Sequence, residues 1–315
     1  MIVTLTLNPS VDRTVEVETL ARGEVMRALH VWVDPGGKGI NVSRALAAHD
    51  LPTRAVVTIG GVEGEHLITL LRDTGIEIVP VVIDGSIRSN ITVAEPDGTT
   101  TKFNEPGAQL SPDELAAAVT AVEGAIESAD WLVASGSLPT GTPAGFYADL
   151  VRRLANSGTR VAVDTSGPAL EAVLAACPAL VKPNRDELAE VTGRHLETVA
   201  DVVEAASRLR DLGVGTVLAS LGPDGAVLVD DDGAIHGRTP SVPPISSVGA
   251  GDAMLAGFLA GGGKGADALI EALAWGAAAA LQPGSGMPSP NEIDRAAVRL
   301  ERQPAPRRDL LALPP

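Results

Sequence analysis

The sequence has 315 residues and is 45% hydrophobic but only 2% aromatic, so we expect a large core built from aliphatic side chains. Lys and Arg number 24 against 40 Asp and Glu, a net charge of −16, which argues against a nucleic-acid or anionic-membrane surface but allows a phosphorylated small molecule. Cys177 is the only cysteine, which excludes an internal disulfide. With no basic leader and no run of about 18 apolar residues, we expect a cytoplasmic protein without membrane contact.

The first third of the chain combines strand and helix patterns. A buried strand over 2–7 is expected to end in the turn signal NPSVD at 8–12. The patterns that follow predict a half-exposed strand over 14–20, a helix over 39–50, a strand over 54–60, a helix over 64–75, and strands over 76–84 and 89–105, the last bent into a hairpin at PDG.

From Ser111 the alternation becomes regular. We expect helices over 111–129, 142–158, 168–177, 185–193, 199–213, 252–261 and 266–282, and strands over 131–136, 160–167, 179–184, 216–222 and 225–230. Strands that alternate with amphipathic helices indicate an α/β fold with a mostly parallel sheet covered on both faces. The more polar segments near 12–33 and 87–104 interrupt this rhythm and are expected to form a small extra sheet. No linker divides the chain, so we expect one domain over 1–315.

Polar or glycine residues stand at nearly every expected strand end. They are Asn8 to Asp12, Gly60, Ser135 to Leu138, Asp164, Lys182 to Asn184, Ser220 to Gly222, and the loop before Asp252. Ligands of open parallel sheets bind at the carboxyl ends of the strands, so these residues predict the binding edge.

Two glycine-rich turns precede helices. In DPGGKG, Gly36, Gly37 and Gly39 let backbone amides approach an anion and Lys38 adds a cation, although a tight turn with a solvated lysine explains the same residues. In SVGAGD, Asp252 could cap its helix, serve as a catalytic carboxylate beside amides that hold a phosphate, or do both, since the two are not exclusive. A position at the helix N-terminus predicts a lowered pKa for Asp252.

Other polar residues have both a binding and a structural interpretation. Asp12 could accept from two sugar hydroxyls or simply form a turn, and Arg88, with Asn90 beside it, could contact a phosphate or lie solvated on a strand. Arg27 is a weaker candidate of the same type as Arg88. An Asn184-x-x-Glu187 pair could hold the water around Mg²⁺ or only start a helix.

The remaining motifs narrow the chemistry. The loop Ser220 to Gly225 fits a nucleotide phosphate or ribose, or a hairpin turn. The five histidines lack the spacing of a zinc site, and neither a G-x-S-x-G elbow nor a dinucleotide G-x-G-x-x-G is present, which argues against hydrolases and NAD-linked oxidoreductases.

Taken in order, TLNPSVD, GGKGINVSRAL, FNEPG, SGSLP, LVKPNRDEL, SLGPDG and SVGAGDAMLAGF resemble the PfkB (ribokinase-like) carbohydrate kinases over Thr4 to about Gly284. TLNPSVD, R-x-N at Arg88 to Asn90 and FNEPG look most like the branch of 1-phosphofructokinases and tagatose-6-phosphate kinases, and the minor bacterial 6-phosphofructokinase is another relative. Ser246, just before SVGAGD, and Ala253, just after it, differ from the residues that the family commonly has there. Asp252 and the glycines of the motif are kept.

The resemblance implies a ribokinase-like three-layer α/β/α sandwich with a small β-sheet lid that often mediates dimerisation. It implies transfer of the ATP γ-phosphoryl group to a sugar phosphate with Mg²⁺. It implies Asp252 as the base, and Gly249, Ala250 and Gly251 as the anion hole. The substrate positions implied are Asp12, Gly36, Gly37, Lys38, Asn41, Arg88, Asn90, Arg27 and Ser137. The nucleotide positions are Lys182, Asn184, Ser220, Gly222, Gly225 and Gly251, and the metal position is Glu187. A catalytically silent sugar-phosphate sensor is the competing function, but it would be expected to lose the base or the glycines.

Overall fold

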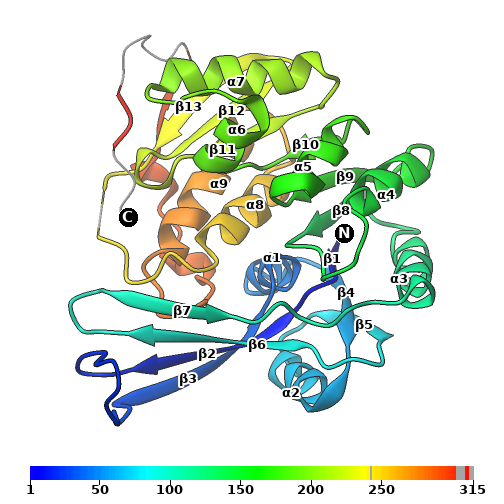
Figure 1. The fold of residues 1–315 in the computed structure, drawn as a ribbon. Helices are drawn as coiled ribbons and strands as arrows, with labels where there is room; N and C mark the ends of the chain where they lie inside the picture. The colour runs from blue at the N-terminus through cyan, green and yellow to red at the C-terminus, as the bar shows by residue number, and fades with distance from the viewer. Residues whose placement is uncertain (242, 303–308, 312–315) are drawn as a thin grey trace.

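A computed structural model describes residues 1–241, 243–302 and 309–311 of the chain. Its main sheet has ten strands in the order β14-β13-β12-β11-β10-β9-β8-β1-β4-β5 (Figure 1). These strands are β1 (Ile2–Thr6), β4 (Thr53–Ile59), β5 (Glu77–Val82), β8 (Trp131–Ser135), β9 (Arg160–Asp164), β10 (Leu180–Val181), β11 (Val217–Ser220), β12 (Ala226–Asp230), β13 (Gly233–Arg238) and β14 (Arg299–Glu301). The strands from β5 to β11 pair in parallel, and β12, β13 and β14 add an antiparallel edge.

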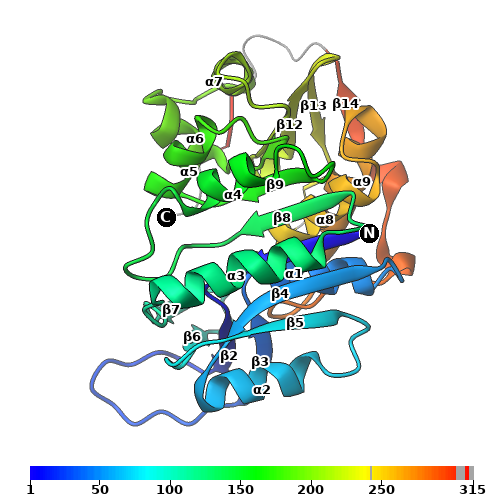
Figure 2. The same ribbon diagram turned by 90° about the vertical axis from the view of Figure 1, so that its right-hand side faces the viewer.

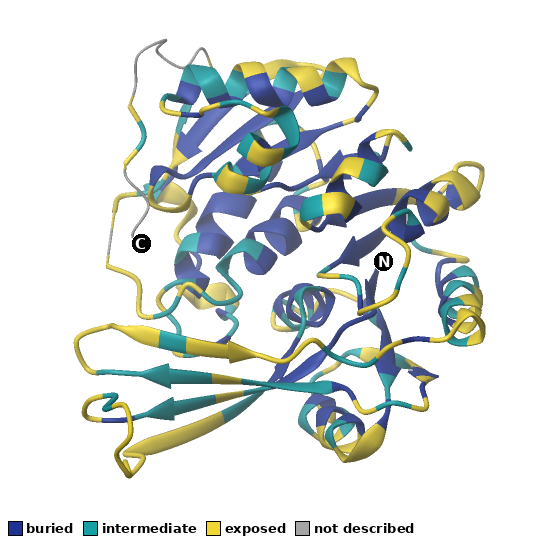
Figure 3. Cartoon of the chain, in the orientation of Figure 1, coloured by how far each residue is buried: buried dark blue, intermediate teal, exposed yellow. Residues whose placement is uncertain are grey.

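Helices cover both faces of this sheet and enclose two apolar cores (Figure 2). The described helices are α1 (Lys38–Ala47), α2 (Gly61–Leu71), α3 (Pro112–Ala125), α4 (Phe146–Leu154), α5 (Gly167–Leu174), α6 (Arg185–Thr192), α7 (Val199–Asp211), α8 (Ala250–Ala260) and α9 (Gly265–Ala279). Helices α1, α8 and α9 share one core, and α3 to α7 share the other, with α2. The strands between them are buried on both sides, which explains their continuous runs of Val, Leu, Ile and Ala (Figure 3). The predicted three-layer α/β/α fold is confirmed.

A separate four-stranded sheet, the small sheet, projects from one end of the main body (Figure 1). It contains β2 (Ser10–Glu16), β3 (His30–Gly36), β6 (Arg88–Ala94) and β7 (Thr100–Asn104) in the order β3-β2-β6-β7. The pairing aligns even-numbered residues with even-numbered residues in all four strands, so odd and even positions lie on opposite faces. The even face carries Asp12, Asp34, Asn90 and Asn104, whereas the odd face carries Val15, Val31, Val33, Ile91, Val93 and Phe103.

Several elements differ from the sequence-based expectations. The segment expected as a turn over 8–12 instead enters β2 at Ser10, because these residues pair with both β3 and β6. Helix α4 begins at Phe146 rather than at 142, and β10 has only two residues. The edge strands β13 and β14 were not predicted from the sequence.

None of the helices in the described ranges combines the length and the apolar character that a membrane span requires.

Candidate active site

The carboxyl ends of β1, β8, β9 and β10 meet at one edge of the main sheet, and α1 and α8 begin beside them. This arrangement follows from parallel pairing, which places every strand end on the same side. Charged residues from distant parts of the chain converge there.

The centre of this edge is Asp164, the last residue of β9, whose side chain is fully buried. Its Oδ1 accepts a hydrogen bond from Lys38 Nζ at 2.7 Å, and Lys182 Nζ lies 3.0 Å from its Oδ2. Burial alone would raise the pKa of Asp164, but the two ammonium groups outweigh it and hold this pKa below its ordinary value. We refer to Lys38, Asp164 and Lys182 as the lysine–aspartate cluster.

The two lysines are exposed to different extents. The Lys182 side chain is 5% exposed and that of Lys38 is 36% exposed, so Lys38 retains access to a ligand. Burial opposes the charge on Lys38, but Asp164, Asp252 and Glu187 outweigh this effect and raise the pKa of Lys38. Lys38 is therefore held as a cation beside the helix starts.

Asp252 lies in the first turn of α8 and is 7% exposed. Its Oδ2 accepts a hydrogen bond from Asn41 Nδ2 at 2.9 Å, and among the described residues no backbone amide donates to this carboxylate, so Asp252 does not cap the helix. Burial, followed by the negative charge of Asp164, raises the pKa of Asp252 to about 6. The lowered pKa expected from the helix N-terminus is wrong, because the loss of solvation outweighs the helix dipole.

The turn before Asp252 exposes backbone amides. Gly249 has a φ of 79°, a left-handed conformation that favours glycine, and α8 starts at Ala250. The first amides of a helix have no intrahelical partner and can bind an anion. A Cβ built on Gly251 would lie 3.5 Å from Lys182 Nζ, which places this cation next to the same amides.

The second glycine turn joins the small sheet to α1. A Cβ on Gly36 would collide with Asp12 Oδ2 and Ser10 Oγ, so glycine leaves room for these polar atoms. Gly37 has a φ of 122°, and a Cβ there would lie 2.7 Å from Thr6 Cγ2. The close approach brings Lys38 to Asp164, which a turn with a solvated lysine would not do.

A second polar group, the small-sheet cluster of Asp12, Arg88 and Asn90, occupies the even face of the small sheet where it meets the main body. Asp12 Oδ1 accepts from Asn90 Nδ2 at 2.9 Å and from Ser10 Oγ at 2.6 Å. Arg88 donates to the carbonyl oxygens of Asn8 at 3.1 Å and Glu105 at 3.3 Å. Asn90 Oδ1 and Arg88 Nε have no hydrogen-bond partner among the described residues.

Two further substrate candidates lie in different surroundings. Ser137 follows β8 and accepts a hydrogen bond from Asn8 Nδ2 at 3.2 Å, so it lies at the same edge of the main sheet. Arg27 lies in the 17–29 segment that connects β2 and β3, within its exposed part at 22–29, and within the described ranges no hydrogen bond or ion pair joins it to another candidate.

The nucleotide and metal candidates form the adjoining strand ends. Asn184 caps α6 by accepting from the amide of Glu187 at 2.8 Å, and Glu187 Oε2 accepts from the Asn184 amide at 2.8 Å, so this pair does start a helix. Asn184 also bridges to Ser220 at the end of β11. Gly222 and Gly225 have φ values of 57° and 87° in the tight turn that follows.

The sequence analysis placed Asp164 at a strand end but assigned it no function, and it did not single out Asn8 or Arg44. The missing information is spatial, because 126 residues separate Asp164 from Lys38. A polar residue directly after a buried strand was the available signal, and it did not identify the partners.

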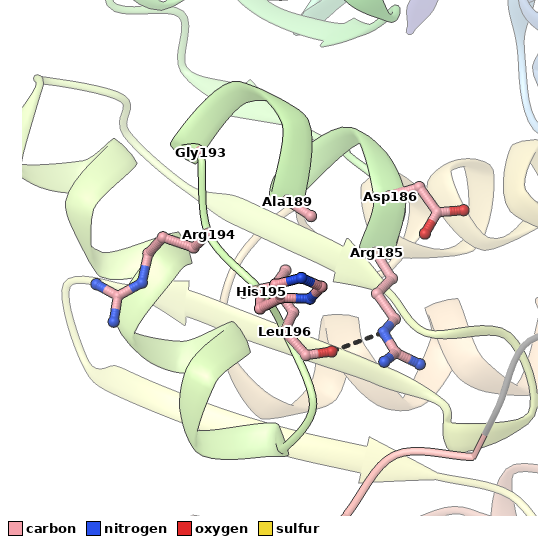
Figure 4. A pocket seen from close by; sticks show the side chains of 7 residues that line it. All are labelled: Arg185, Asp186, Ala189, Gly193, Arg194, His195 and Leu196. Carbon is pink, nitrogen blue, oxygen red and sulfur yellow. Dashed lines mark hydrogen bonds between the residues drawn. The ribbon is translucent and has the colours of Figure 1, made fainter.

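A separate open pocket of about 570 Å³ lies along α6 and the turn after it (Figure 4). It is lined by Arg185, Asp186, Ala189, Gly193, Arg194, His195 and Leu196. Both of its arginines are already bonded: Arg185 to the carbonyl oxygen of Leu196, and Arg194 to Glu204. None of the candidate site residues lines this pocket, and the convergence of charged groups described above lies elsewhere.

The comparisons with known families, sequences and structures agree with one another. Residues 5–292 match the family described as pfkB family carbohydrate kinase. The 1-phosphofructokinase of Haloferax volcanii is 42% identical over 265 residues, covering 82% of this chain and 83% of that protein, and the 1-phosphofructokinase of Rhodobacter capsulatus is 41% identical over 261 residues, covering 82% of each. Among solved structures, phosphofructokinase-2 from Escherichia coli in complex with potassium superposes with a TM-score of 0.87 at 36% identity, covering 93% of this chain and 96% of that one.

Proposed function

Because the chain belongs to the pfkB family of carbohydrate kinases, which makes it an ATP-dependent sugar kinase, we propose that it phosphorylates fructose 1-phosphate to fructose 1,6-bisphosphate. The observation that carries the proposal is Asp252, a buried carboxylate at a helix N-terminus that faces two lysines held by Asp164. The names of the relatives support the choice of substrate, and the geometry of the site supports the proposed chemistry.

In this proposal Asp252 is the general base. Its carboxylate takes the proton from the attacking sugar hydroxyl as oxygen bonds to the γ-phosphorus and the bond to ADP breaks. A pKa near 6 leaves Asp252 ionised at neutral pH yet basic enough to hold the proton. Asn41 fixes the carboxylate by its hydrogen bond to Oδ2 and leaves Oδ1 for the hydroxyl.

The charge that develops on the transferred group needs fixed donors. The amides of Gly249, Ala250 and Gly251 are positioned to supply them, and Lys182 lies beside Gly251. Lys38, the more exposed lysine, is assigned to the same ligand. We assign the nucleotide to the adjoining strand ends around Asn184, Ser220, Gly222 and Gly225.

The sugar phosphate is assigned to the small-sheet cluster. Asp12 offers a carboxylate for sugar hydroxyls, and Asn90 Oδ1 and Arg88 Nε are buried polar atoms without a hydrogen-bond partner among the described residues. Arg88 suits the substrate phosphate, because a guanidinium binds phosphate through planar paired donors. Gly36, Gly37, Ser137 and Arg27 are the remaining substrate candidates.

For Mg²⁺, we propose Glu187 as the main protein contact. In the described ranges no group of three or more His, Cys, Asp or Glu residues could hold a metal, a pattern that fits an ion held mainly by water and phosphate. The capping box occupies Glu187 Oε2 and leaves Oε1 without a hydrogen-bond partner among the described residues, so the residue fits that role. When bound, the ion neutralises charge on the phosphate oxygens.

A coupled ADP-release assay tests the assignment with fructose 1-phosphate, fructose 6-phosphate and tagatose 6-phosphate at equal concentrations. We expect the highest kcat/KM with fructose 1-phosphate. Fructose 6-phosphate is the second candidate, favoured by the 36% identity with phosphofructokinase-2 over 93% of the chain. Absence of turnover with all three sugars would overturn the proposal.

We also propose that residues 1–315 act as one kinase domain and that the small sheet both covers the substrate and joins two copies. The odd face of the small sheet exposes Val31 at 48%, Ile91 at 40% and Phe103 at 56%, whereas the even face carries the small-sheet cluster. A mainly apolar face opposite a binding face suits a homodimer. Light scattering should report a dimer for the wild type and a monomer for Phe103→Glu, with Lys102→Glu on the even face as the control.

A further inference from the structure

The side chain of Arg44, on the last turn of α1, links its own helix to two other parts of the molecule, β3 and the segment after α9. Its Nη1 lies 3.0 Å from both the carbonyl oxygen and Oγ of Ser285, 3.4 Å from the carbonyl oxygen of Pro35, and 3.3 Å from Asn41 Oδ1. Its Nη2 lies 3.9 Å from Asp34 Oδ1. The side chain is only 15% exposed, so these groups take the place of water around the charge.

The contact with Asn41 determines which way its amide faces. A guanidinium has only donors, so the amide oxygen of Asn41 must turn toward Arg44. The amide NH₂ group then points the other way, to Asp252 Oδ2 at 2.9 Å. If the amide were reversed, an oxygen would face the carboxylate and an NH₂ group would face the guanidinium, and both contacts would become repulsive.

The other partners of Arg44 fix its position. Asp34 and Pro35 belong to β3 of the small sheet, and Ser285 lies in the segment after α9. The same segment packs behind the α8 turn, because a Cβ on Gly249 would lie 3.9 Å from Ser285 Cα and 3.9 Å from Asn41 Nδ2. Arg44 is thus braced by the base of the small sheet and by the support of the anion-binding turn.

We propose that Arg44 is a positioning residue for phosphoryl transfer, which holds the Asn41 amide with its NH₂ group toward Asp252 and ties that orientation to β3 and to Ser285. The proposal rests on the function assigned to Asp252 above. Arg44 acts through Asn41 and not directly on the base: the groups that face Asp252 are Asp164, Lys38, Lys182 and Asn41.

The test is a double-mutant cycle of Arg44→Met and Asn41→Ala, with Arg152→Met on the exposed surface of α4 as the control. We expect Arg44→Met to lower kcat about tenfold, the scale of one hydrogen bond to a charged group, and to have no further effect once Asn41 is alanine. Additive losses in the double variant would overturn the proposal.

A second readout does not depend on turnover. The hydrogen bond from Asn41 lowers the pKa of Asp252, so Arg44→Met should move the titration of the Asp252 carboxyl to higher pH. Carbon-13 NMR of the ligand-free protein measures this titration, with the signal assigned by its loss in Asp252→Asn. An unchanged titration in a folded Arg44→Met variant would overturn the role of Arg44 even if the substrate proves to be a different sugar.

If Arg44→Met does not fold, the same cycle is run with Arg44→Lys. A single ammonium cannot bridge Ser285 and Asn41 with the same geometry, so a smaller shift of the same sign is expected. Wild-type titration and kcat in Arg44→Lys would count against the proposal.

Discussion

The lysine–aspartate cluster and the small-sheet cluster use charge in different ways. In the first, Asp164 is completely buried and both of its carboxylate oxygens face lysines. In the second, Asp12, Arg88 and Asn90 are half-buried, and atoms of Arg88 and Asn90 have no hydrogen-bond partner among the described residues.

This difference suits two tasks. Phosphoryl transfer needs fixed charges whose geometry does not change with the substrate, and a buried network provides them. Substrate recognition needs free hydrogen-bonding groups, which a partly open sheet can present. Changes in the first cluster should therefore lower kcat, whereas changes in the second should raise KM.

Asp252→Asn should have the largest effect. The amide has nearly the same shape and can still accept from Asn41, but it cannot take the proton, so kcat should fall roughly 10²–10⁴-fold. Binding of the sugar phosphate and ATP should change little, which isothermal titration can measure. Turnover close to that of the wild type would show that Asp252 is not the base.

Asp164→Asn should have the next largest effect. It leaves two neighbouring ammonium groups without their shared counter-charge, one of them on the nearly buried Lys182, so we expect a loss of about 3 kcal/mol in the free energy of unfolding. Loss of lysine orientation should lower kcat roughly 10²-fold. Denaturant unfolding and steady-state kinetics measure both, with Asp149→Asn, which removes only an exposed ion pair, as the control.

The pH dependence gives Asp164→Asn a sharper outcome. If Asp252 is the base, as proposed, only its deprotonated form is active, so the kcat/KM of the wild type should decline below about pH 6. The negative charge of Asp164 contributes to the raised pKa of Asp252, and removing it should move this decline to lower pH. A decline that moves to higher pH would contradict the electrostatic account.

The sequence predicts the fold well where local patterns decide it. Apolar runs that alternate with amphipathic helices identified the strands and helices from Ser111 to Asp230, because strand and helix periodicities differ. The start of β2 depends on pairing with β6, and β14 depends on pairing with β13. Each of these partners is distant in the chain, so no local pattern contains the pairing.

For the candidate site too, some features could be predicted from the sequence and others could not. Glycine turns and strand ends predicted where Lys38, Lys182 and Asp252 would gather. The shared counter-ion, Asp164, and the pKa of Asp252 depend on distances and burial that only the folded chain defines. The sequence predicted that Asp252 lies at the N-terminus of a helix, but it did not predict that burial would remove water from its carboxylate.

Arg88→Gln tests the role of the small-sheet cluster in substrate binding. It removes a cation that can bind phosphate through paired donors, so the KM for the sugar phosphate should rise about 10–100-fold, while kcat and the KM for ATP change little. Arg152→Gln is the control, because Arg152 lies on the exposed surface of α4, outside both clusters. A loss confined to kcat would place Arg88 with the transfer chemistry and contradict the division of roles.

Glu187→Gln should have the smallest effect, and it separates the proposed Mg²⁺-binding role of Glu187 from its capping role in α6. Glutamine can still accept from the Asn184 amide, so the capping box and the Tm should be kept, whereas the loss of charge should raise the Mg²⁺ concentration for half-maximal rate by about tenfold. Asn184→Ala is the matched comparison: it removes the cap from α6 and should cost about 1 kcal/mol of stability. An unchanged Mg²⁺ dependence in Glu187→Gln would leave Glu187 with only its structural role in α6, and the ion would then depend on the phosphates and on other residues at the main-sheet edge.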